Sequence, residues 1–281
     1  MKIQVLIENT TKSDLVPEHG LSIFIEYNDK KILLDAGSTS AFINNAEKMK
    51  ANINEADFCV LSHGHYDHSG GFGEYLSQNP EKKIYAMDTI VGEYYSASGG
   101  TVHYIGVPEA VYPKHKDNFI LLNEITKLAD GVYVIPHKKT VDLSEIGERA
   151  KLYKKIDDEY RPDDFNHELS LVFDTEAGLV IFNSCSHSGI VNIIDEVKEY
   201  FGQGKEVAAF IGGLHMKGKS GEKEICTFSE NEIEEMTKYL EKNSVKKLYT
   251  GHCTGMVGYE LIKKYIGEKV EYIYTGRELT I

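Results

Sequence analysis

The sequence has no long apolar segment and no export signal. No stretch approaches the roughly 18 consecutive apolar residues that a membrane-spanning helix requires. The chain opens with MKIQVLIENT, in which the apolar run is too short for a signal peptide and polar residues follow at once. We therefore expect no membrane partner, and the cytoplasm is the predicted location.

The sequence also lacks a basic excess. Its 44 Asp and Glu outnumber 31 Lys and Arg, which gives a net charge of −13. Proteins that bind the phosphate backbone of nucleic acids carry a basic surface. The charge therefore argues against nucleic acid as a partner, although a local basic pocket for one small phosphorylated ligand remains compatible with it.

Cysteine pairs are absent as well. The four cysteines are scattered along the chain, and none belongs to a Cys-x-x-Cys motif. Without an export signal we expect reduced thiols and not a disulfide framework. The four residues are Cys59, Cys185, Cys226 and Cys253.

Hydrophobic patterns predict alternating strands and helices in the first and last thirds of the chain. The first third predicts strands at 3–7, 21–27, 31–35 and 58–61, with a hairpin around Asn28-Asp29 between the second and third strands and a helix from about Ser40. The last third predicts strands at 169–173, 179–183, 207–211, 245–249 and 270–274, and helices at 189–201, after the capping box of Ser229 and Glu232, and through 261–266. Two β-rich halves, each with outer helices, predict two sheets packed between helical layers.

The middle of the chain, at about 88–165, is rich in Tyr, Gly and Lys and has only short apolar runs, such as 119–122 and 132–135. We interpret it as an irregular insertion with some strand content. No linker, repeat or low-complexity segment interrupts the 281 residues. The sequence therefore predicts a single domain spanning 1–281, with this insertion lining a substrate pocket.

A dense cluster of metal-binding residue types follows the predicted strand at 58–61. His63 and His65 are two positions apart on an extended segment, so both can bind one metal ion. Asp67 and His68 follow a turn and can bind a second metal ion. Imidazole and carboxylate suit Zn²⁺, and also Fe²⁺ or Mn²⁺. The protein has only 11 histidines, so three within six positions are improbable as a chance surface loop.

This cluster, followed by Ser69-Gly70-Gly71, resembles the HxHxDHxGG signature of the metallo-β-lactamase superfamily. The resemblance extends over nearly the whole chain. It implies an α/β fold, the αββα four-layer sandwich of two mixed sheets with helices outside, and two divalent metal ions at one edge. His65 stands where the flavodiiron oxygen reductases of the same fold carry Glu, which favours hydrolytic over redox chemistry.

The resemblance implies further metal ligands at the ends of later strands. His252, in Gly-His-Cys-Thr-Gly, resembles the last ligand of the family and would complete the second metal with Asp67 and His68. Where the family usually has a bridging Asp, this sequence has Ser184-Cys185. Cys185 or His187 could replace that bridge, or the second metal could bind weakly.

Three other residues complete the predicted site. His167 and His187 compete for the remaining place on the first metal, or both could bind. His167 stays open between a ligand and a group that supports one, and for His187 the alternative is a histidine that only caps the next helix. Asp35, in Asp-Ala-Gly, resembles the early Asp of the family, which orients a metal-bound histidine; plain turn chemistry is the alternative.

Three motifs resemble one branch of the superfamily. CSHSGI, GGLH and GHCTG together are similar to proteins related to the 7,8-dihydropterin-6-methyl-4-(β-D-ribofuranosyl)aminobenzene-5′-phosphate synthases. We assign His215 of GGLH to substrate binding or proton donation; a structural histidine bonded to a nearby carbonyl is the alternative. Many bacterial proteins share this branch without making methanopterin, so the branch does not settle the activity.

The middle segment offers groups that could bind substrate. Tyr94 and Tyr95 could stack on a planar ring such as a pterin. A run of cations could hold a phosphate, although nearby acidic residues offset much of its charge and a solvated surface is the alternative. These cations are Lys138, Lys139, Arg149, Lys151, Lys154, Lys155 and Arg161.

These observations predict a metal-dependent hydrolase. A hydroxide held by two metals, most simply zinc, is the expected nucleophile, because coordination lowers the pKa of water from about 15.7 to roughly 7. Asp67 would ligate metal and orient the hydroxide, and His215 would protonate the leaving group. The substrate is expected to be a small molecule that could carry a phosphate. Two alternatives remain: a synthase-type transferase of the branch named above, and a non-catalytic metal- or ligand-binding protein.

Overall fold

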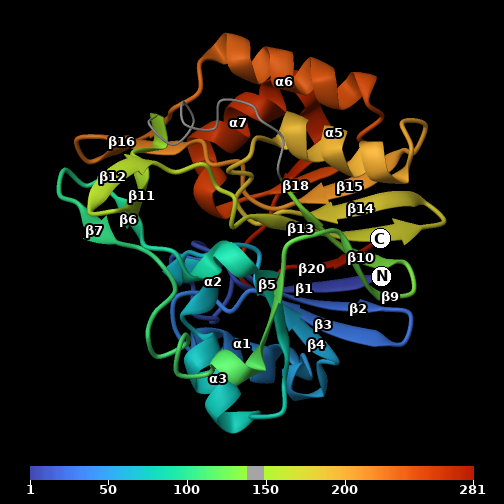
Figure 1. The fold of residues 1–281 in the computed structure, drawn as a ribbon. Coiled ribbons are helices and arrows are strands. Elements are labelled where there is room, and N and C mark those ends of the chain that lie inside the picture. Colours follow the sequence, from blue (N-terminus) through green and yellow to red (C-terminus); the bar gives the residue numbers. More distant parts are fainter. Residues whose placement is uncertain (138–148) are drawn as a thin grey trace. The chain divides into compact units, whose positions relative to one another are not determined.

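Strand pairing divides the chain between two large sheets (Figure 1). The structure, a computed structural model, describes residues 1–137 and 149–281. Contacts group them into two units. The first holds the described residues within 1–125, 140–169 and 274–281, and the second holds those within 126–139 and 170–273.

The first unit contains a mixed seven-stranded sheet in the order β20-β1-β2-β3-β4-β5-β8. Neighbours from β20 to β3 are antiparallel, and those from β3 to β8 are parallel. The strands are β1 (Lys2–Ile7), β2 (Ser22–Tyr27), β3 (Lys30–Leu34), β4 (Phe58–Val60), β5 (Ile84–Met87), β8 (Phe119–Leu122) and β20 (Glu278–Thr280).

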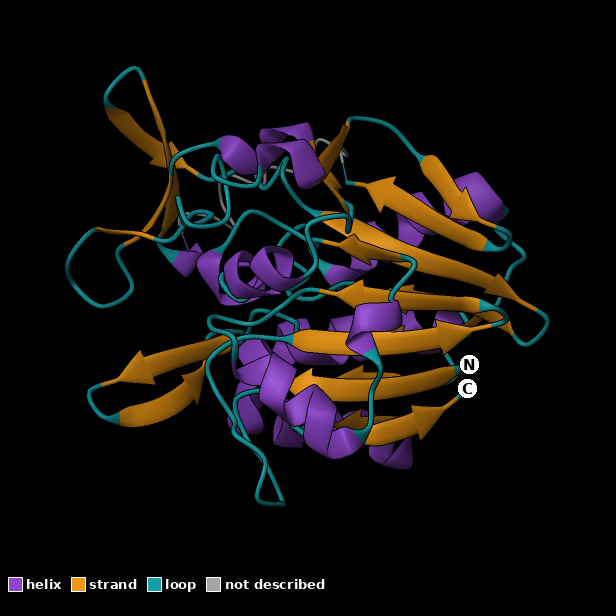
Figure 2. Cartoon of the chain, turned by 90° about the horizontal axis from the view of Figure 1, so that it is seen from below, coloured by secondary structure: helices purple, strands orange, loops and turns teal. Residues whose placement is uncertain are grey.

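Local sequence explains the hairpin at the centre of this sheet. Tyr27 pairs with Lys30, so the connection between β2 and β3 is the two-residue turn Asn28-Asp29, and Asn28 has a φ of 52°. At the sheet edge, β20 pairs with β1. The two chain ends lie side by side (Figures 1 and 2), where the Met1 amino group donates to the Ile281 carbonyl at 2.7 Å.

Short helices complete the first unit. The rings of Phe42 and Tyr75 lie 6.0 Å apart, and the Tyr75 hydroxyl donates to the Ile53 carbonyl at 2.8 Å, which ties these helices together. They are α1 (Ala41–Met49), α2 (Tyr66–Ser69), α3 (Phe72–Gln78), η1 (Ile53–Glu55), η2 (Asp88–Val91) and η3 (Lys116–Asn118). A small sheet in the order β12-β11-β6-β7 comprises β6 (Tyr94–Ser96), β7 (His103–Tyr104), β11 (Leu152–Ile156) and β12 (Glu159–Pro162).

The second large sheet is also mixed, in the order β19-β18-β15-β14-β13-β10-β9. Strands β14, β15, β18 and β19 are parallel neighbours, whereas β13 pairs antiparallel with β14. The strands are β9 (Thr126–Ala129), β10 (Val132–Pro136), β13 (Leu169–Thr175), β14 (Gly178–Phe182), β15 (Val207–Ile211), β18 (Leu248–Thr250) and β19 (Val270–Tyr272), beside a separate hairpin of β16 (Lys217–Ser220) and β17 (Lys223–Cys226).

Helices cover one side of this second sheet (Figure 1). Ile193 of α5, Ile233 of α6 and Ile262 of α7 share one buried cluster with strand residues such as Val172 and Ile181. Burial of this apolar surface, at about 25 cal/mol per Å², holds the helices on the strands. The helices are α5 (Ile190–Phe201), α6 (Glu230–Lys242), α7 (Gly255–Ile266), η4 (His252–Thr254) and η5 (Gly267–Lys269).

The predicted fold class is confirmed, since both large sheets are mixed and helices pack on them. The capping box of Ser229 and Glu232 is present at the start of α6. The predicted insertion at about 88–165 holds the small sheet, but its strand β8 extends the first large sheet and β9 and β10 extend the second. Among the described residues, no helix is both long and apolar enough to cross a membrane.

Candidate metal centre

In the first unit, two neighbouring parallel strands end at the same edge of the sheet, and polar residues follow each of them. Asp35 directly follows β3, and Ser62 and His63 follow the neighbouring strand β4. The carboxyl ends of parallel neighbours meet at the same edge. Residues 27 positions apart in the sequence therefore come into direct contact.

Asp35 is the centre of a buried hydrogen-bond network. Its Oδ1 accepts from the Ser62 backbone N–H at 2.8 Å, and its Oδ2 accepts from Ser62 Oγ at 2.7 Å. The same Oδ2 lies 2.7 Å from His68 Nδ1, and Ser62 Oγ lies 2.8 Å from His63 Nδ1. Asp35 has a φ of 57°, a left-handed conformation that Asp tolerates better than most residues.

This network assigns the tautomers of two histidines. A carboxylate only accepts, so Nδ1 of His68 carries the proton. Ser62 Oγ donates its hydrogen to Asp35, so it accepts from Nδ1 of His63. Both rings then carry their lone pair on Nε2, the form in which imidazole binds a metal. The Asp35 carboxylate orients the His68 ring directly and the His63 ring through the Ser62 hydroxyl.

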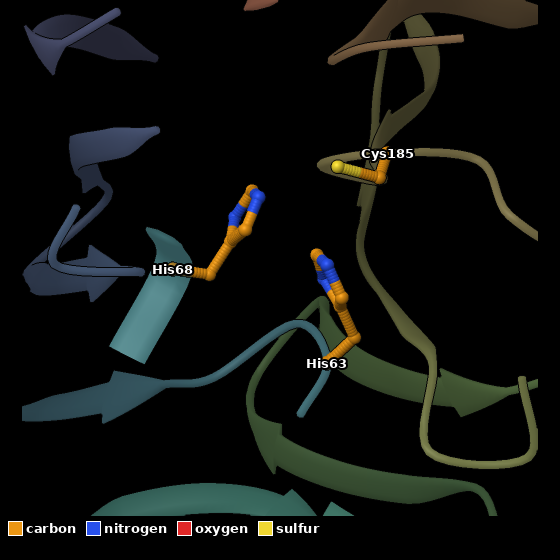
Figure 3. Close-up of side chains that lie close together, drawn as sticks. All are labelled: His63, His68 and Cys185. Atoms are coloured by element: carbon orange, nitrogen blue, oxygen red, sulfur yellow. The ribbon is translucent and has the colours of Figure 1, made fainter. Parts of the chain in front are cut away.

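The three clustered histidines are packed together. The His63 ring centroid lies 4.2 Å from that of His68 and 4.6 Å from that of His65. His63 stands on the loop after β4, and His68 stands on α2 (Figure 3). All three rings are buried, and a buried polar group is costly unless a partner compensates it. Several imidazoles and a carboxylate at one place fit a divalent metal ion such as zinc.

His65 is held in the neutral form. Its burial, together with the nearby His167 ring, lowers its pKa to about 3. A neutral imidazole offers a lone pair to a metal, whereas an imidazolium does not.

Asp67 has a partner that the sequence interpretation missed. Its Oδ2 lies 3.2 Å from Nε2 of His19 and 3.6 Å from Nε2 of His68. Between β1 and β2, Gly20 has a φ of 145°, and a Cβ there would lie 2.3 Å from the Asp67 carbonyl oxygen. Glycine permits that close approach, but a single histidine beside a glycine gives no sequence signal for it.

His167 contacts protein through both ring nitrogens. Its Nδ1 accepts from the Gly64 N–H at 3.1 Å, and its Nε2 lies 3.1 Å from Asp163 Oδ2. Burial alone raises the pKa of Asp163, but the His167 ring outweighs it and holds that pKa below the usual range. Of the two roles predicted for His167, this geometry favours support of the 63–68 loop, although His65, Asp163 and His167 do bring three ligand atoms within 4.8 Å of one another.

The two tyrosines predicted to bind substrate differ in exposure. Tyr94 is only 3% exposed, its ring centroid lies 4.1 Å from that of His167, and its hydroxyl donates to the Thr89 carbonyl. Tyr95 is partly exposed, and its ring packs edge-on against Tyr104. Tyr94 therefore has a packing role in this unit, and Tyr95 is the better placed to meet a ligand.

The predicted phosphate-binding cations are largely engaged with carboxylates. Lys154 pairs with Asp164, and Lys155 lies 2.7 Å from Asp158. Arg161 Nη2 lies 3.1 Å from Glu159. Lys138 and Lys139 lie outside the described residues. These pairings reduce the positive charge that the run can offer a phosphate.

In the second unit, three adjacent parallel strands carry the remaining candidates. Cys185 follows β14, His215 follows β15 and His252 follows β18. Their loops therefore begin at the same edge of the sheet. Figure 3 shows Cys185 on its loop after β14.

The second unit brings together a group that includes a residue absent from the predicted site. Ligand atoms of Cys185, His252 and Cys253 lie within 4.8 Å of one another, and all three residues are buried. Cys253 Sγ accepts from the His215 N–H at 3.3 Å. Burial raises the pKa of the Cys253 thiol, but contact with Cys185 and the nearby His252 outweigh it and hold that pKa well below its usual value. Thiolate and imidazole are typical zinc ligands.

His187 and His215 lie next to each other, with ring centroids 4.4 Å apart. His187 is buried, whereas His215 is partly exposed. Nδ1 of His215 has no hydrogen-bond partner within the described part of the chain. That nitrogen is itself buried, although the ring as a whole is partly exposed.

Sequence and fold comparisons give a consistent result. The family model described as Metallo-beta-lactamase superfamily matches residues 15–146. A 7,8-dihydropterin-6-methyl-4-(beta-D-ribofuranosyl)-aminobenzene-5'-phosphate synthase of Methanocaldococcus jannaschii is 28% identical, over 99% of this chain and 95% of that protein. The crystal structure of Tm1679, a metal-dependent hydrolase of the β-lactamase superfamily, superimposes with a TM-score of 0.82 at 26% identity, covering 100% of this chain and 99% of that one.

A third comparison concerns the fold alone. Zn²⁺-bound PqqB from Methylobacterium extorquens has a TM-score of 0.57 at 13% identity, with complete coverage of both chains. At this identity the likeness extends to the arrangement of strands and helices and not to the chemistry.

Proposed function

We propose that this chain is a metal-dependent hydrolase of the metallo-β-lactamase superfamily acting on a small molecule. The observation that carries this proposal is the Asp35 network, which puts the lone pairs of His63 and His68 on Nε2. A merely structural cluster would not need one buried carboxylate to set the tautomers of two adjacent rings.

We assign two divalent metal ions, zinc in the first instance and iron or manganese as alternatives, to this protein. The ligands proposed in the first unit are His63, His65, Asp67 and His68; those in the second are Cys185, His187 and His252, with His167 as support or ligand. When bound, such ions activate water near neutral pH and polarise a carbonyl or phosphoryl oxygen.

The protein's own residues supply orientation and proton transfer. Asp35 holds the His68 ring through Nδ1, and His19 holds the Asp67 carboxylate at 3.2 Å. Asp67 orients the attacking water. His215 donates a proton to the leaving group from its partly exposed ring. Tyr95 is the aromatic side chain proposed to contact the substrate.

A transferase of the synthase type is the second candidate. It is favoured by the 28% identity that extends over 99% of the chain to a synthase of that name. In that case the same residues would bind a phosphorylated substrate for a condensation. The third candidate, a protein that binds metal or ligand without turnover, predicts tight metal binding and no product. For each of them we propose a cytoplasmic protein without a nucleic-acid partner.

Turnover by the metal-replete protein tests the proposal. Phosphodiester, thioester and lactone substrates are assayed with the wild type, His65→Ala, His252→Ala and the control His103→Ala, which removes an exposed histidine on β7. Loss of turnover in the first two variants, with the control active, supports a hydrolase. Equal turnover in all four contradicts it. Product formed only from pterin and ribofuranosyl phosphate compounds would favour the synthase.

A further inference from the structure

A row of buried polar groups in the second unit lies outside the proposed metal ligands. His137 Nδ1 lies 2.8 Å from Glu196 Oε2, and His137 Nε2 lies 2.7 Å from Ser170 Oγ. This is the order of a Ser–His–acid triad. Ser170 is fully buried, however, and its Oγ also accepts from Asn183 Nδ2 at 3.0 Å. No substrate can reach this hydroxyl, so the row has another role.

The hydrogen bonds all run in one direction. The Glu196 carboxylate accepts, so His137 donates from Nδ1 and carries its lone pair on Nε2. Ser170 therefore donates to His137 and accepts from the Asn183 amide. Asn183 Oδ1 in turn accepts from the Ser186 N–H at 2.6 Å. Each donor has one acceptor, and a consistently oriented chain of this kind strengthens its members.

The row ends on the loop that carries two proposed metal ligands. Ser186 stands between Cys185 and His187, directly after β14. Its φ of 51° is a left-handed conformation, which a serine adopts only when neighbouring contacts hold it there. The Asn183 bond holds its N–H, and a bond from Ser186 Oγ to the Gly213 carbonyl at 2.8 Å holds its side chain.

We propose that His137 is a positioning residue which, through Ser170 and Asn183, holds the 184–188 loop in the conformation that presents Cys185 and His187. His137 lies just after β10 and Glu196 lies on α5, so this row connects the loop to an edge strand and to an outer helix. The use of the loop for metal binding rests on the proposed function. The positioning of its backbone does not.

The rate at which Cys185 is alkylated reports how firmly the 184–188 loop is held, and it can be measured without any metal. Metal-free, reduced protein is treated with iodoacetamide, and modification of each cysteine is followed by peptide mass spectrometry. His137→Phe keeps a ring but removes both hydrogen bonds, and Ser170→Ala removes the bridging hydroxyl. Because each variant removes two buried hydrogen bonds of the row that supports the loop, we expect Cys185 to react about fivefold faster in either variant. The half-buried Cys226 on β17 is the internal reference, and its rate should not change.

Matched variants distinguish a specific effect on the 184–188 loop from a general loss of stability in the second unit. Thr237→Ala removes another buried hydroxyl of the second unit, which donates to the Glu234 carbonyl at 2.9 Å, far in sequence from the loop. It should leave the Cys185 rate unchanged. Ser170→Thr keeps the hydroxyl and should restore a rate near that of the wild type. Glu196→Ala removes the terminal acceptor of the row, and it serves if either central variant fails to fold.

The outcomes are distinct. Unchanged Cys185 rates in Ser170→Ala and Glu196→Ala overturn the proposal, and so does equal acceleration in Thr237→Ala. Zinc affinity, measured by chelator competition on the same variants, addresses the proposed function separately. Faster alkylation with unchanged zinc affinity supports the positioning role of His137 and contradicts the assignment of Cys185 and His187 as ligands.

Discussion

Asp35 and His68 are joined by a 2.7 Å contact between Oδ2 and Nδ1, and both side chains are fully buried. They come from positions 33 apart, the first directly after β3 and the second on α2. A carboxylate behind an imidazole fixes the orientation of the ring and raises the basicity of its other nitrogen. This relationship makes the network directly testable.

Replacing Asp35 with Asn should weaken metal binding while preserving the backbone. Asn tolerates a φ of 57° about as well as Asp, so the turn is kept and only the carboxylate charge is lost. We expect zinc affinity to fall by about 10- to 100-fold, measured by competition with a chelator. Asp29→Asn, an exposed carboxylate on the β2–β3 turn, should bind zinc like the wild type. Wild-type affinity in Asp35→Asn would mean that His68 is not a ligand oriented by Asp35.

The metal-free protein should lose stability as the pH falls below about 6.5. The folded pKa of His65 is about 3, below its unfolded value of 6.5, so between these values the unfolded chain binds more protons. Stability therefore rises with pH in this window and falls on acidification, by at most about 1.4 kcal/mol per pH unit for one such group. Urea unfolding at about pH 7 and about pH 5.5 measures the loss, which should be about 1 kcal/mol smaller in His65→Asn. An identical pH dependence in the two proteins would show that His65 is not buried in the neutral form.

Gly213 should not tolerate a side chain. A Cβ there would lie 2.4 Å from Cys253 Sγ and 2.9 Å from the Ser184 carbonyl oxygen. We expect Gly213→Ala to cost about 2 kcal/mol of unfolding free energy, because such overpacking forces neighbouring groups apart. The cost should shrink in a Cys253→Ala background, where the sulfur is gone. Gly204→Ala, which meets nothing within 4 Å, should change stability by no more than about 0.5 kcal/mol. Similar values for both glycines would contradict the close packing of these loops.

Substitution of Tyr94 should mainly reduce stability, whereas substitution of Tyr95 should mainly weaken substrate binding. Tyr94 packs with Ile105, Leu152 and Phe165, so Tyr94→Ala should lose about 3 kcal/mol or more of stability. Tyr95→Ala removes a partly exposed ring and should lose about 1 kcal/mol, while raising KM for whichever substrate the assays identify. Urea denaturation and steady-state kinetics measure the two effects. A larger stability loss for Tyr95→Ala would reverse the roles assigned to them.

Much of the fold follows from local sequence signals. The Asn28-Asp29 turn predicts the β2–β3 hairpin, and the Ser229–Glu232 capping box predicts the start of α6; both are confirmed. The 3.6-residue period of α5 predicts its buried face, with Ile193 and Val197 in the core. The hairpin of β16 and β17 was not predicted, because its strands consist largely of Lys, Gly, Ser and Glu and show no apolar alternation.

The candidate site likewise contains some residues that local sequence identifies and others that only the fold brings together. The spacing of His63, His65 and His68 is a local signal that the sequence displays directly. The partners of these residues are not local: His19 reaches Asp67 from 48 positions away, and Ser170 reaches His137 from 33. Such contacts depend on which strands become neighbours. Cys253, next to His252, was overlooked because its thiol acquires significance only beside Cys185.

The loops after β14, β15 and β18 all leave from one edge of the second sheet, whereas the paired backbone of those strands lies behind them. Insertions and exchanges in these loops would leave the inter-strand ladders intact. A library that varies the partly exposed His215 and the turn between β16 and β17, and holds Asn183 and Gly213 constant, would therefore sample new specificities on an unaltered scaffold. The division between a hydrogen-bonded frame of strands and replaceable loop tips makes this chain a suitable starting point for directed evolution.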